Sequence, residues 1–211
     1  MALLSTRKST LRKNGIARRQ QLLDAAQGLL ETHELDAISL GDVAAAAEVP
    51  KGSAYHFYDD IKDLYSALLS RFAEELVGIL EAPLSGKLKS WRDVVEALNR
   101  RGVKFYAGNR AAMQLQIGPK VPTELKLRDR QNDAAIGGIY ERHIATHFTL
   151  PEFEDRSKVF FRAVEIADLM FMLSVLERGH ITVDMGREAS KAMCAYLACY
   201  LPELPPRGRT K

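Results

Sequence analysis

The sequence predicts an all-α fold, and three observations lead to that prediction. Apolar residues recur at helical spacing, as at Leu40, Val43 and Ala47, which occupy positions i, i+3 and i+7. No segment of the chain alternates apolar and polar residues in the way that a half-buried β-strand does. Helix-ending residues such as Gly179 and Pro202 follow the long apolar segments.

Composition places the chain among ordinary globular proteins and narrows its functions. Of its 211 residues 46% are hydrophobic, and a net charge of +3 is too small by itself to indicate nucleic-acid binding. No apolar run reaches the roughly 18 residues of a membrane span, and the N-terminus lacks the apolar core of a signal peptide. We therefore expect a cytoplasmic protein. No glycine-rich phosphate loop, serine elbow or cysteine nucleophile pattern is present, so we expect no enzyme, no catalytic residue and no cofactor.

The N-terminal region is expected to begin with a flexible basic arm over residues 1–15. Basic residues, and no acidic one, precede Asp24. Such an arm can follow a DNA backbone, or it can be a disordered solubilising tail. The first helix is expected from about Ile16 to Thr32, and its inward residues are Leu22, Leu23, Ala26, Leu29 and Leu30.

Residues 39–58 are expected to form two short helices joined by a tight turn. Ser39 precedes the apolar pattern and can cap the first of these helices, with Asp42 three residues further on. Val49 and Pro50 end that helix, because proline disfavours helical geometry in the residue before it. Proline itself is tolerated at the first position of the next helix.

The second short helix, from about Pro50 to Tyr58, is expected to have a buried and an exposed side. Its inward residues are Ala54, Phe57 and Tyr58. Its outward residues are Lys51, Ser53, Tyr55 and His56. Four hydrogen-bonding side chains on a short exposed helix suit a groove lined with phosphates.

The segment from Arg18 to Leu69 resembles the N-terminal domain of the TetR (tetracycline-repressor) family of bacterial transcriptional regulators. VPKGSAYHFY stands where the family carries its recognition helix, and RRQQLLDAAQGLL and DLYSALL extend the match on either side. The resemblance implies a three-helix helix-turn-helix DNA-binding domain over residues 16–62. It further implies a helical ligand-binding and dimerisation domain over residues 63–201, with a loose tail over 202–211.

The resemblance also implies which residues would meet double-stranded operator DNA. Phosphate contacts are expected from Lys51, Tyr55 and His56. Ser39 would hold the DNA backbone at a helix N-terminus, and Gly52 with Ser53 would approach base edges. Lys62 follows the position of the family's lysine at the start of the fourth helix, which Ile61 occupies here.

Several residues depart from the family's pattern. Glu34 and Glu48 stand where the family commonly has glycine, and a left-handed turn at either would cost about 1 kcal/mol. Asp59 and Asp60 add negative charge near the expected DNA path, although Asp60 can also cap the next helix. Together with Ile61, they leave a second class open, a helical ligand-binding or enzymatic protein that no longer binds DNA.

The remainder of the chain is expected to be helical. The stretch APLSGKLKS is the one clear break, since proline, serine and glycine lie close together there. The expected helices run from about Asp60 to Leu80, Ser90 to Tyr106, Thr123 to His147, Phe153 to Arg178 and Asp184 to Leu201.

The final two helices suggest a homodimer. The helix before the last is apolar on more than one side, so two of its faces need partners. A symmetric bundle of two helices from each subunit would cover them, although the same faces could simply close the core of one chain. The expected interface is a stripe on the last helix, Met185, Ala189, Ala192, Met193, Tyr196 and Tyr200.

A small-molecule effector is implied by the family resemblance, and the sequence is compatible with an apolar or aromatic one. Arg162, Glu165 and Asp168 lie three residues apart, and they form either a polar anchor inside a cavity or an ion-pair row. Core packing would explain the aromatic candidates equally well. The expected ligand-binding residues are Phe105, Tyr106, Met113, Tyr140, Phe161, Arg162 and Met172.

The sequence therefore predicts a homodimeric DNA-binding transcriptional regulator, a repressor released from its operator by a small ligand. A third reading remains open, a metal-responsive regulator. His143 and His147 are four residues apart on one expected helix, a spacing that can place two imidazoles on one metal. No third ligand stands at a telling spacing, so we expect ordinary polar or capping roles for both and no metal site.

Overall fold

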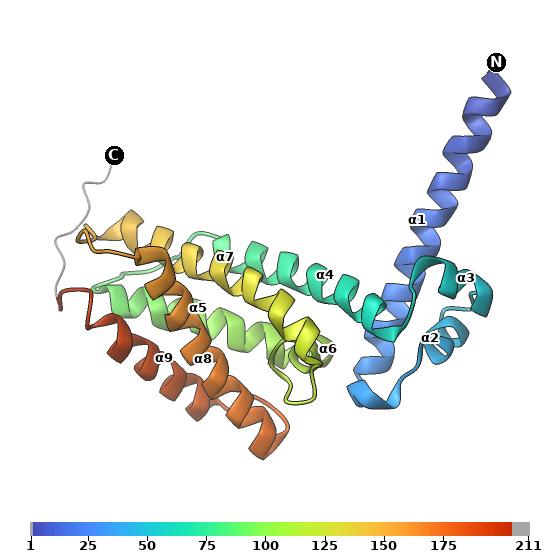
Figure 1. Ribbon diagram of the computed structural model, residues 1–211. Helices are drawn as coiled ribbons and strands as arrows, with labels where there is room; N and C mark the ends of the chain where they lie inside the picture. Colours follow the sequence, from blue (N-terminus) through green and yellow to red (C-terminus); the bar gives the residue numbers. More distant parts are fainter. Residues whose placement is uncertain (1, 204–211) are drawn as a thin grey trace. The chain divides into compact units, whose positions relative to one another are not determined.

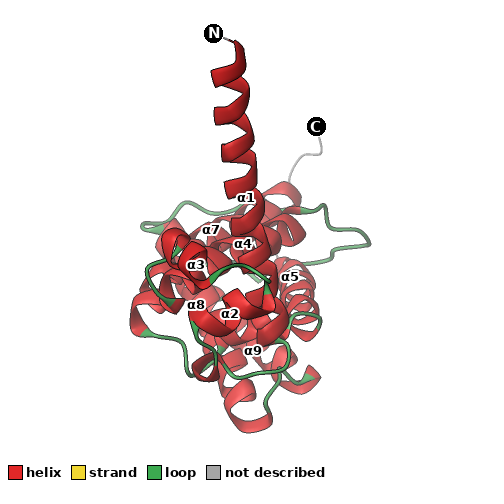
Figure 2. Cartoon of the chain, turned by 90° about the vertical axis from the view of Figure 1, so that its right-hand side faces the viewer, coloured by secondary structure: helices red, strands yellow, loops and turns green. Residues whose placement is uncertain are grey.

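The computed structural model describes the backbone of residues 2–203 and the side chains of residues 14–127 and 130–203. Its regular elements are all helical, and no strand occurs within this described part of the chain (Figure 2). The expected all-α fold is confirmed. The chain divides into two compact units, Met1–Ser70 and Arg71–Lys211, with the division inside α4.

The first unit packs its short helices against α1 around a small core (Figure 1). Leu22, Val43 and Leu64 are completely buried in this core, and the Tyr65 hydroxyl donates a hydrogen bond of 3.0 Å to the carbonyl oxygen of Leu35. The elements are α1 (Ala2–Leu30), the 3₁₀ turn η1 (Leu35–Ala37), α2 (Leu40–Ala46), α3 (Lys51–Phe57) and the first part of α4 (Ile61–Glu81).

The structure corrects the expected start of the first helix. α1 begins at Ala2 rather than near Ile16, so residues 2–15, expected to form an arm, are helical. The physical reason is local propensity, because leucine, lysine and arginine are frequent in this stretch and proline is absent from it.

The expected caps of the short helices are confirmed. The Ser39 hydroxyl accepts a hydrogen bond of 3.2 Å from the Asp42 amide, and Asp42 accepts one of 2.9 Å from the Ser39 amide. This reciprocal pair satisfies two amides that have no partner inside α2. Asp60 caps α4 as expected, since its carboxylate accepts a hydrogen bond of 2.9 Å from the Asp63 amide.

The second unit is a bundle of long helices with a buried core (Figure 1). Trp91 is completely buried and its ring nitrogen donates a hydrogen bond of 2.9 Å to the Pro202 carbonyl. None of the helices in the described residues is long and apolar enough to cross a membrane. The elements after α4 are α5 (Trp91–Ala107), α6 (Arg110–Ala112), the π-helical turn η2 (Met113–Ile117), α7 (Thr123–His147), α8 (Arg156–Arg178) and α9 (Val183–Leu197).

The helix ends in this unit agree with the expectation in part. α7 begins at Thr123 as expected, with Pro122 at the capping position, whereas α8 begins at Arg156 rather than near Phe153. α9 ends at Leu197, one turn before the expected Leu201. Gly179 ends α8 as expected, with a left-handed φ of 74° and an amide that donates to the Val175 carbonyl.

Candidate nucleic-acid interface and ligand cavity

The exposed side of α3 agrees with the expected division of its residues. Ala54 and the following Tyr58 are buried, whereas Lys51, Gly52 and His56 are exposed. The remaining two positions of this side are Tyr55, which is 48% exposed, and Ser53, which is half-buried. We call Lys51, Gly52, Ser53, Tyr55 and His56 the outward face of α3.

The start of α3 lies close to the start of α2. A side chain added at Gly41 would meet the Ser39 hydroxyl at 3.5 Å and the Lys51 ammonium at 3.8 Å. The Lys51 ammonium also lies 6.0 Å from the centre of the Tyr55 ring, within the range of a cation–π contact. Ser39, Lys51 and Tyr55 therefore form one continuous polar surface.

The Ser39 hydroxyl makes its hydrogen bonds to Asp42, in the first turn of α2. Besides accepting from the Asp42 amide, it donates a hydrogen bond of 2.6 Å to the Asp42 carboxylate. These hydrogen bonds hold the pKa of the Asp42 carboxyl below its usual value, and the charges of His33 and Lys51 act in the same direction. The hydroxyl proton is thus used inside the protein, which leaves an oxygen lone pair for any outside donor.

The turn between α2 and α3 contains a left-handed glutamate. Glu48 has a φ of 53° and its amide donates to the Ala45 carbonyl, while the Val49 amide donates to the Ala44 carbonyl. This pair of hydrogen bonds is the Schellman motif that ends many helices, and glycine is the usual residue at the left-handed position. Glu34, the other residue at a family glycine position, has a φ of −75° and needs no glycine.

A support for α3 that sequence reasoning missed comes from α1. The Arg19 guanidinium donates a hydrogen bond of 3.2 Å to the Tyr58 hydroxyl and lies 5.2 Å from the centre of its ring. The two residues are far apart in sequence, so no local pattern could pair them. The contact fixes the end of α3 against α1.

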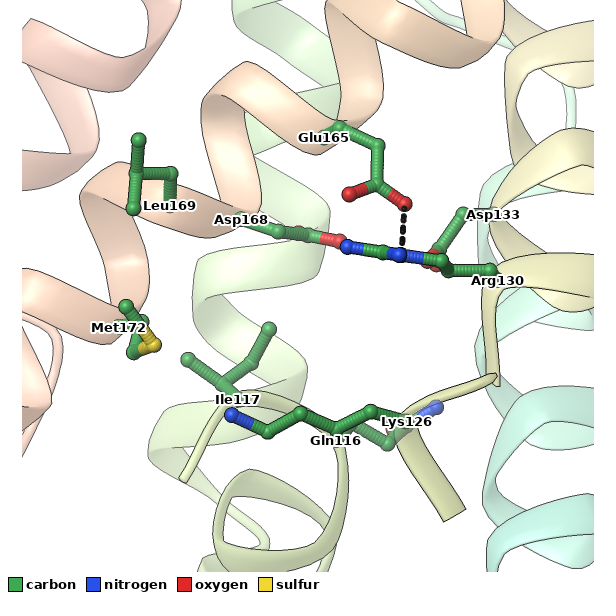
Figure 3. Close-up of a pocket in the computed structure, with 9 residues that line it drawn as sticks. All are labelled: Gln116, Ile117, Lys126, Arg130, Asp133, Glu165, Asp168, Leu169 and Met172. Atoms are coloured by element: carbon green, nitrogen blue, oxygen red, sulfur yellow. Dashed lines mark ion pairs between the residues drawn. The ribbon is translucent and has the colours of Figure 1, made fainter. Parts of the chain in front are cut away.

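The second unit contains a cavity of about 270 Å³ between η2, α7 and α8 (Figure 3). Its polar side chains come from all three elements, and an ion pair of 3.4 Å joins Arg130 on α7 to Glu165 on α8. We call it the ligand cavity. The lining residues are Gln116, Ile117, Lys126, Arg130, Asp133, Glu165, Asp168, Leu169 and Met172.

The close approach of α7 and α8 at one point explains where this cavity lies. At Gly137 an added Cβ would come within 2.8 Å of the Phe161 amide nitrogen, so the two backbones touch there. Moving from that contact toward the start of α7 and the end of α8, the lining residues appear turn by turn on both helices. The cavity therefore occupies the space where the helices lie further apart.

The structure brings only part of the expected ligand-binding set together. Met172 lines the ligand cavity, and Tyr106 and Tyr140 line a much smaller cavity of about 30 Å³ in the core. Phe105 and Met113 are buried but line neither cavity, and Arg162 and Phe161 also lie outside both linings. Glu165 and Asp168 line the ligand cavity, whereas Arg162 does not.

Comparison with known proteins identifies the first unit. Residues 22–68 match the family model described as bacterial regulatory proteins, tetR family. The chain carries a TetR-family N-terminal domain. The resemblance seen in the sequence is confirmed, and the matched residues include α2, α3 and the outward face of α3.

Individual similar proteins agree with this result. The HTH-type transcriptional repressor KstR2 of Rhodococcus jostii is 35% identical over 81 residues, which cover 38% of this chain and 39% of that protein. A TetR-family regulator from Streptomyces coelicolor superposes with a TM-score of 0.64 at 23% identity, covering 87% and 99% of the two chains.

A third similar protein is known in complex with a ligand. SmeT, the repressor of the Stenotrophomonas maltophilia multidrug efflux pump SmeDEF, is represented by its triclosan complex with a TM-score of 0.60 at 16% identity. The superposition covers 92% of this chain and 100% of that one. At 23% and 16% identity, these two superpositions show that the TetR fold is shared and nothing more.

The expected dimer stripe on α9 needs a correction. Ala189 and Met193 are completely buried within this chain, together with Leu197, so they cannot offer surface to a second copy of the chain. Their spacing of four residues places all three on the inward side of α9. The other four members of the stripe retain surface, since Met185, Ala192 and Tyr196 are half-buried and Tyr200 is exposed.

The two histidines of the metal alternative occupy different surroundings. His143 Nε2 lies 2.9 Å from the Leu80 carbonyl oxygen, which can only accept, so the ring donates to the last turn of α4. His147 lies on the last turn of α7, with its ring edge-to-face against Phe148. The expected capping role is thus met at His143.

Proposed function

We propose that this protein is a homodimeric DNA-binding transcriptional regulator, a repressor that a small molecule releases from its operator. The observation that carries the proposal is the outward face of α3, at the position of the recognition helix in a matched TetR-family domain. Lys51, Tyr55 and His56 would contact phosphates, and Gly52 with Ser53 would approach base edges. Gly52 suits such an approach, because an added Cβ there would meet no atom within 4 Å.

Relatives support both halves of this proposal. KstR2 and SmeT are named as repressors, and SmeT forms a complex with triclosan. Such a protein would act in the cytoplasm, where it meets DNA, and we propose no catalytic role for any residue. Lys62 is exposed on the first turn of α4 and would add a further phosphate contact.

We place the dimer interface mainly on α8 rather than on the α9 stripe. Leu169 and Leu176 on α8 are 51% and 63% exposed, and they lie two turns apart on one side of the helix. Val183 at the start of α9 is 68% exposed and Tyr200 is 37% exposed. Large apolar side chains left exposed on one side of a helix, as at Leu169 and Leu176, are typical of surfaces that a partner covers.

A substitution in this surface tests the dimer. Leu176→Glu would place a charge at the centre of the covered surface and should convert the dimer into a monomer that keeps its helical content, as measured by light scattering and circular dichroism. Glu177→Gln, one residue further on and also exposed, is the matched control. A Leu176→Glu variant that remains dimeric would contradict this placement.

Ligand release follows from linkage. A ligand that binds better to a dimer with badly spaced recognition helices must weaken operator affinity by the same factor. A two-fold symmetric dimer also requires an operator with two inverted half-sites, separated by about 34 Å or a multiple of it.

The proposal is tested by binding to the DNA that flanks the protein's own coding region. Binding should resist excess nonspecific competitor and weaken steeply between two salt concentrations, because phosphate contacts release counterions. Loss of all binding to the competitor would favour the alternative class, a helical ligand-binding protein that no longer binds DNA.

A further inference from the structure

The ligand cavity contains hydrogen-bond acceptors that the protein leaves without a donor. Glu165 Oε1 and Gln116 Oε1 are both buried and have no hydrogen-bond partner. Because an amide can rotate to present its NH₂ group instead, Gln116 can pair with either a donor or an acceptor on a ligand. An ionised carboxylate can only accept. Glu165 therefore determines which ligand group the cavity favours, namely a donor.

Arg130 makes an ion pair with Glu165 but no hydrogen bond to Glu165 Oε1. Its Nε lies 3.4 Å from Glu165 Oε1, longer than the roughly 2.7–3.2 Å of a good hydrogen bond. The Arg130 side chain is 59% exposed and that of Glu165 is 30% exposed, so the guanidinium lies on the solvent side of the pair. Figure 3 shows it reaching from α7 to below Glu165, with its end in line with Asp168 in this view. A long, exposed side chain that makes no hydrogen bond to its partner carboxylate is readily replaced by a cation that does make one.

The charge of the lining also favours a cation. Three carboxylates, Asp133, Glu165 and Asp168, face two basic side chains, Lys126 and Arg130. When Arg130 turns outward, Glu165 loses the ion pair that it makes with Arg130. Leaving a partly buried carboxylate without a cation is costly, so the cavity gains most from a ligand that brings its own positive charge.

We propose that the ligand cavity takes a small molecule with a cationic nitrogen donor, which replaces the Arg130 guanidinium at Glu165. The rest of the ligand would pack against Ile117 and Met172, which line the same cavity. This keeps the expected apolar or aromatic skeleton and adds an amine, amidine or guanidine group to it. The inference rests on the proposed ligand-responsive function and specifies its effector class.

Three probes of one skeleton test this proposal: 4-phenylbutylamine, 4-phenylbutanol and 4-phenylbutyrate. Each is titrated by calorimetry into the full-length protein in the absence of DNA. A charge-assisted hydrogen bond should make the amine bind about ten-fold more tightly than the alcohol, and the carboxylate should bind most weakly. Equal affinities, a preference for the carboxylate, or no binding by any probe at millimolar concentration would overturn the proposal.

Two variants with opposite expected effects separate this mechanism from general packing. Glu165→Gln removes the charge at nearly the same volume and should bring the affinities of amine and alcohol within about three-fold of each other. Arg130→Ala removes the competing cation and should strengthen amine binding several-fold. Weaker amine binding by Arg130→Ala would contradict the replacement step. Glu177→Gln, also on α8 but outside the lining, should leave all three affinities unchanged.

The outcomes distinguish this inference from the proposed function. Selective amine binding by a protein that fails to retain DNA would uphold the cavity's preference and reject the regulator. Operator binding together with a preference for the carboxylate would uphold the regulator and reject the cationic ligand.

Discussion

The cap of α2, beside the outward face of α3, joins residues close in sequence, whereas the hydrogen bonds of Asn99 in the interior of the second unit join distant ones. Ser39 bonds to Asp42, three residues away. Asn99 instead donates to the Ser190 hydroxyl at 3.0 Å and accepts from the Tyr140 hydroxyl at 2.6 Å. The first interaction depends on adjacent residues alone, whereas the second joins α5, α7 and α9.

Breaking the hydrogen bonds of Asn99 with Ser190 and Tyr140 should lower the free energy of unfolding the most. Asn99→Ala removes a side chain that is 3% exposed and leaves the Tyr140 hydroxyl without its acceptor. We expect a loss of about 3 kcal/mol in the free energy of unfolding, from the cavity and the unsatisfied hydroxyl together. Urea denaturation measures it, with exposed Arg100→Ala on the same helix as a control expected within about 0.5 kcal/mol of the wild type. If Asn99→Ala lost less than about 0.5 kcal/mol, the contrast between the two regions would disappear.

The cap of α2 should have a smaller effect. Ser39→Ala removes both the hydroxyl acceptor and the hydroxyl donor, and we expect a loss of about 1 kcal/mol. The effect should depend on pH, because the Ser39 hydrogen bonds lower the pKa of Asp42 below its ordinary 3.8. A lowered pKa stabilises the folded state above pH 3.8, and this stabilisation disappears as the pH falls through the folded pKa. Denaturation at neutral and strongly acidic pH would show the difference between variant and wild type shrinking in acid; a constant difference would contradict this account.

The left-handed turn offers the smallest change, in the opposite direction. Glu48→Gly relieves the backbone strain at a φ of 53°, partly offset by the greater freedom of glycine in the unfolded chain. We expect a gain of about 0.7 kcal/mol in the free energy of unfolding. Glu34→Gly is the matched control and should give no gain, because Glu34 has a φ of −75°. Equal effects at both positions would mean that the turn at Glu48 is unstrained.

Features decided by neighbours in sequence could be predicted, and those decided by distant packing could not. The caps at Ser39 and Asp60 and the outward face of α3 depend on a few adjacent residues, and the structure has them where they were expected. The Arg130–Glu165 pair and the inward position of Met193 depend on how whole helices pack. A stripe of small and apolar residues looks the same from sequence whether it faces its own chain or a partner, which is why the α9 stripe was assigned incorrectly in part.

The lining of the ligand cavity could not be predicted from sequence spacing either. The spacing of Glu165 and Asp168 indicated that they share a side of one helix, but an ion-pair row on that helix and a cavity lining were equally compatible with it. The partner of Glu165 comes from α7, and the close contact at Gly137 that separates the helices beyond it has no sequence signature of its own.

The central claim, that the outward face of α3 contacts DNA phosphates, is tested most directly by the salt dependence of operator affinity in Lys51→Ala. Lys87→Ala, in the exposed loop after α4, is the control. If Lys51 contacts a phosphate, its removal should weaken binding to specific and nonspecific DNA alike and make the slope of log affinity against log salt shallower by about one unit. A slope and an affinity equal to those of the wild type and of Lys87→Ala would contradict the claim.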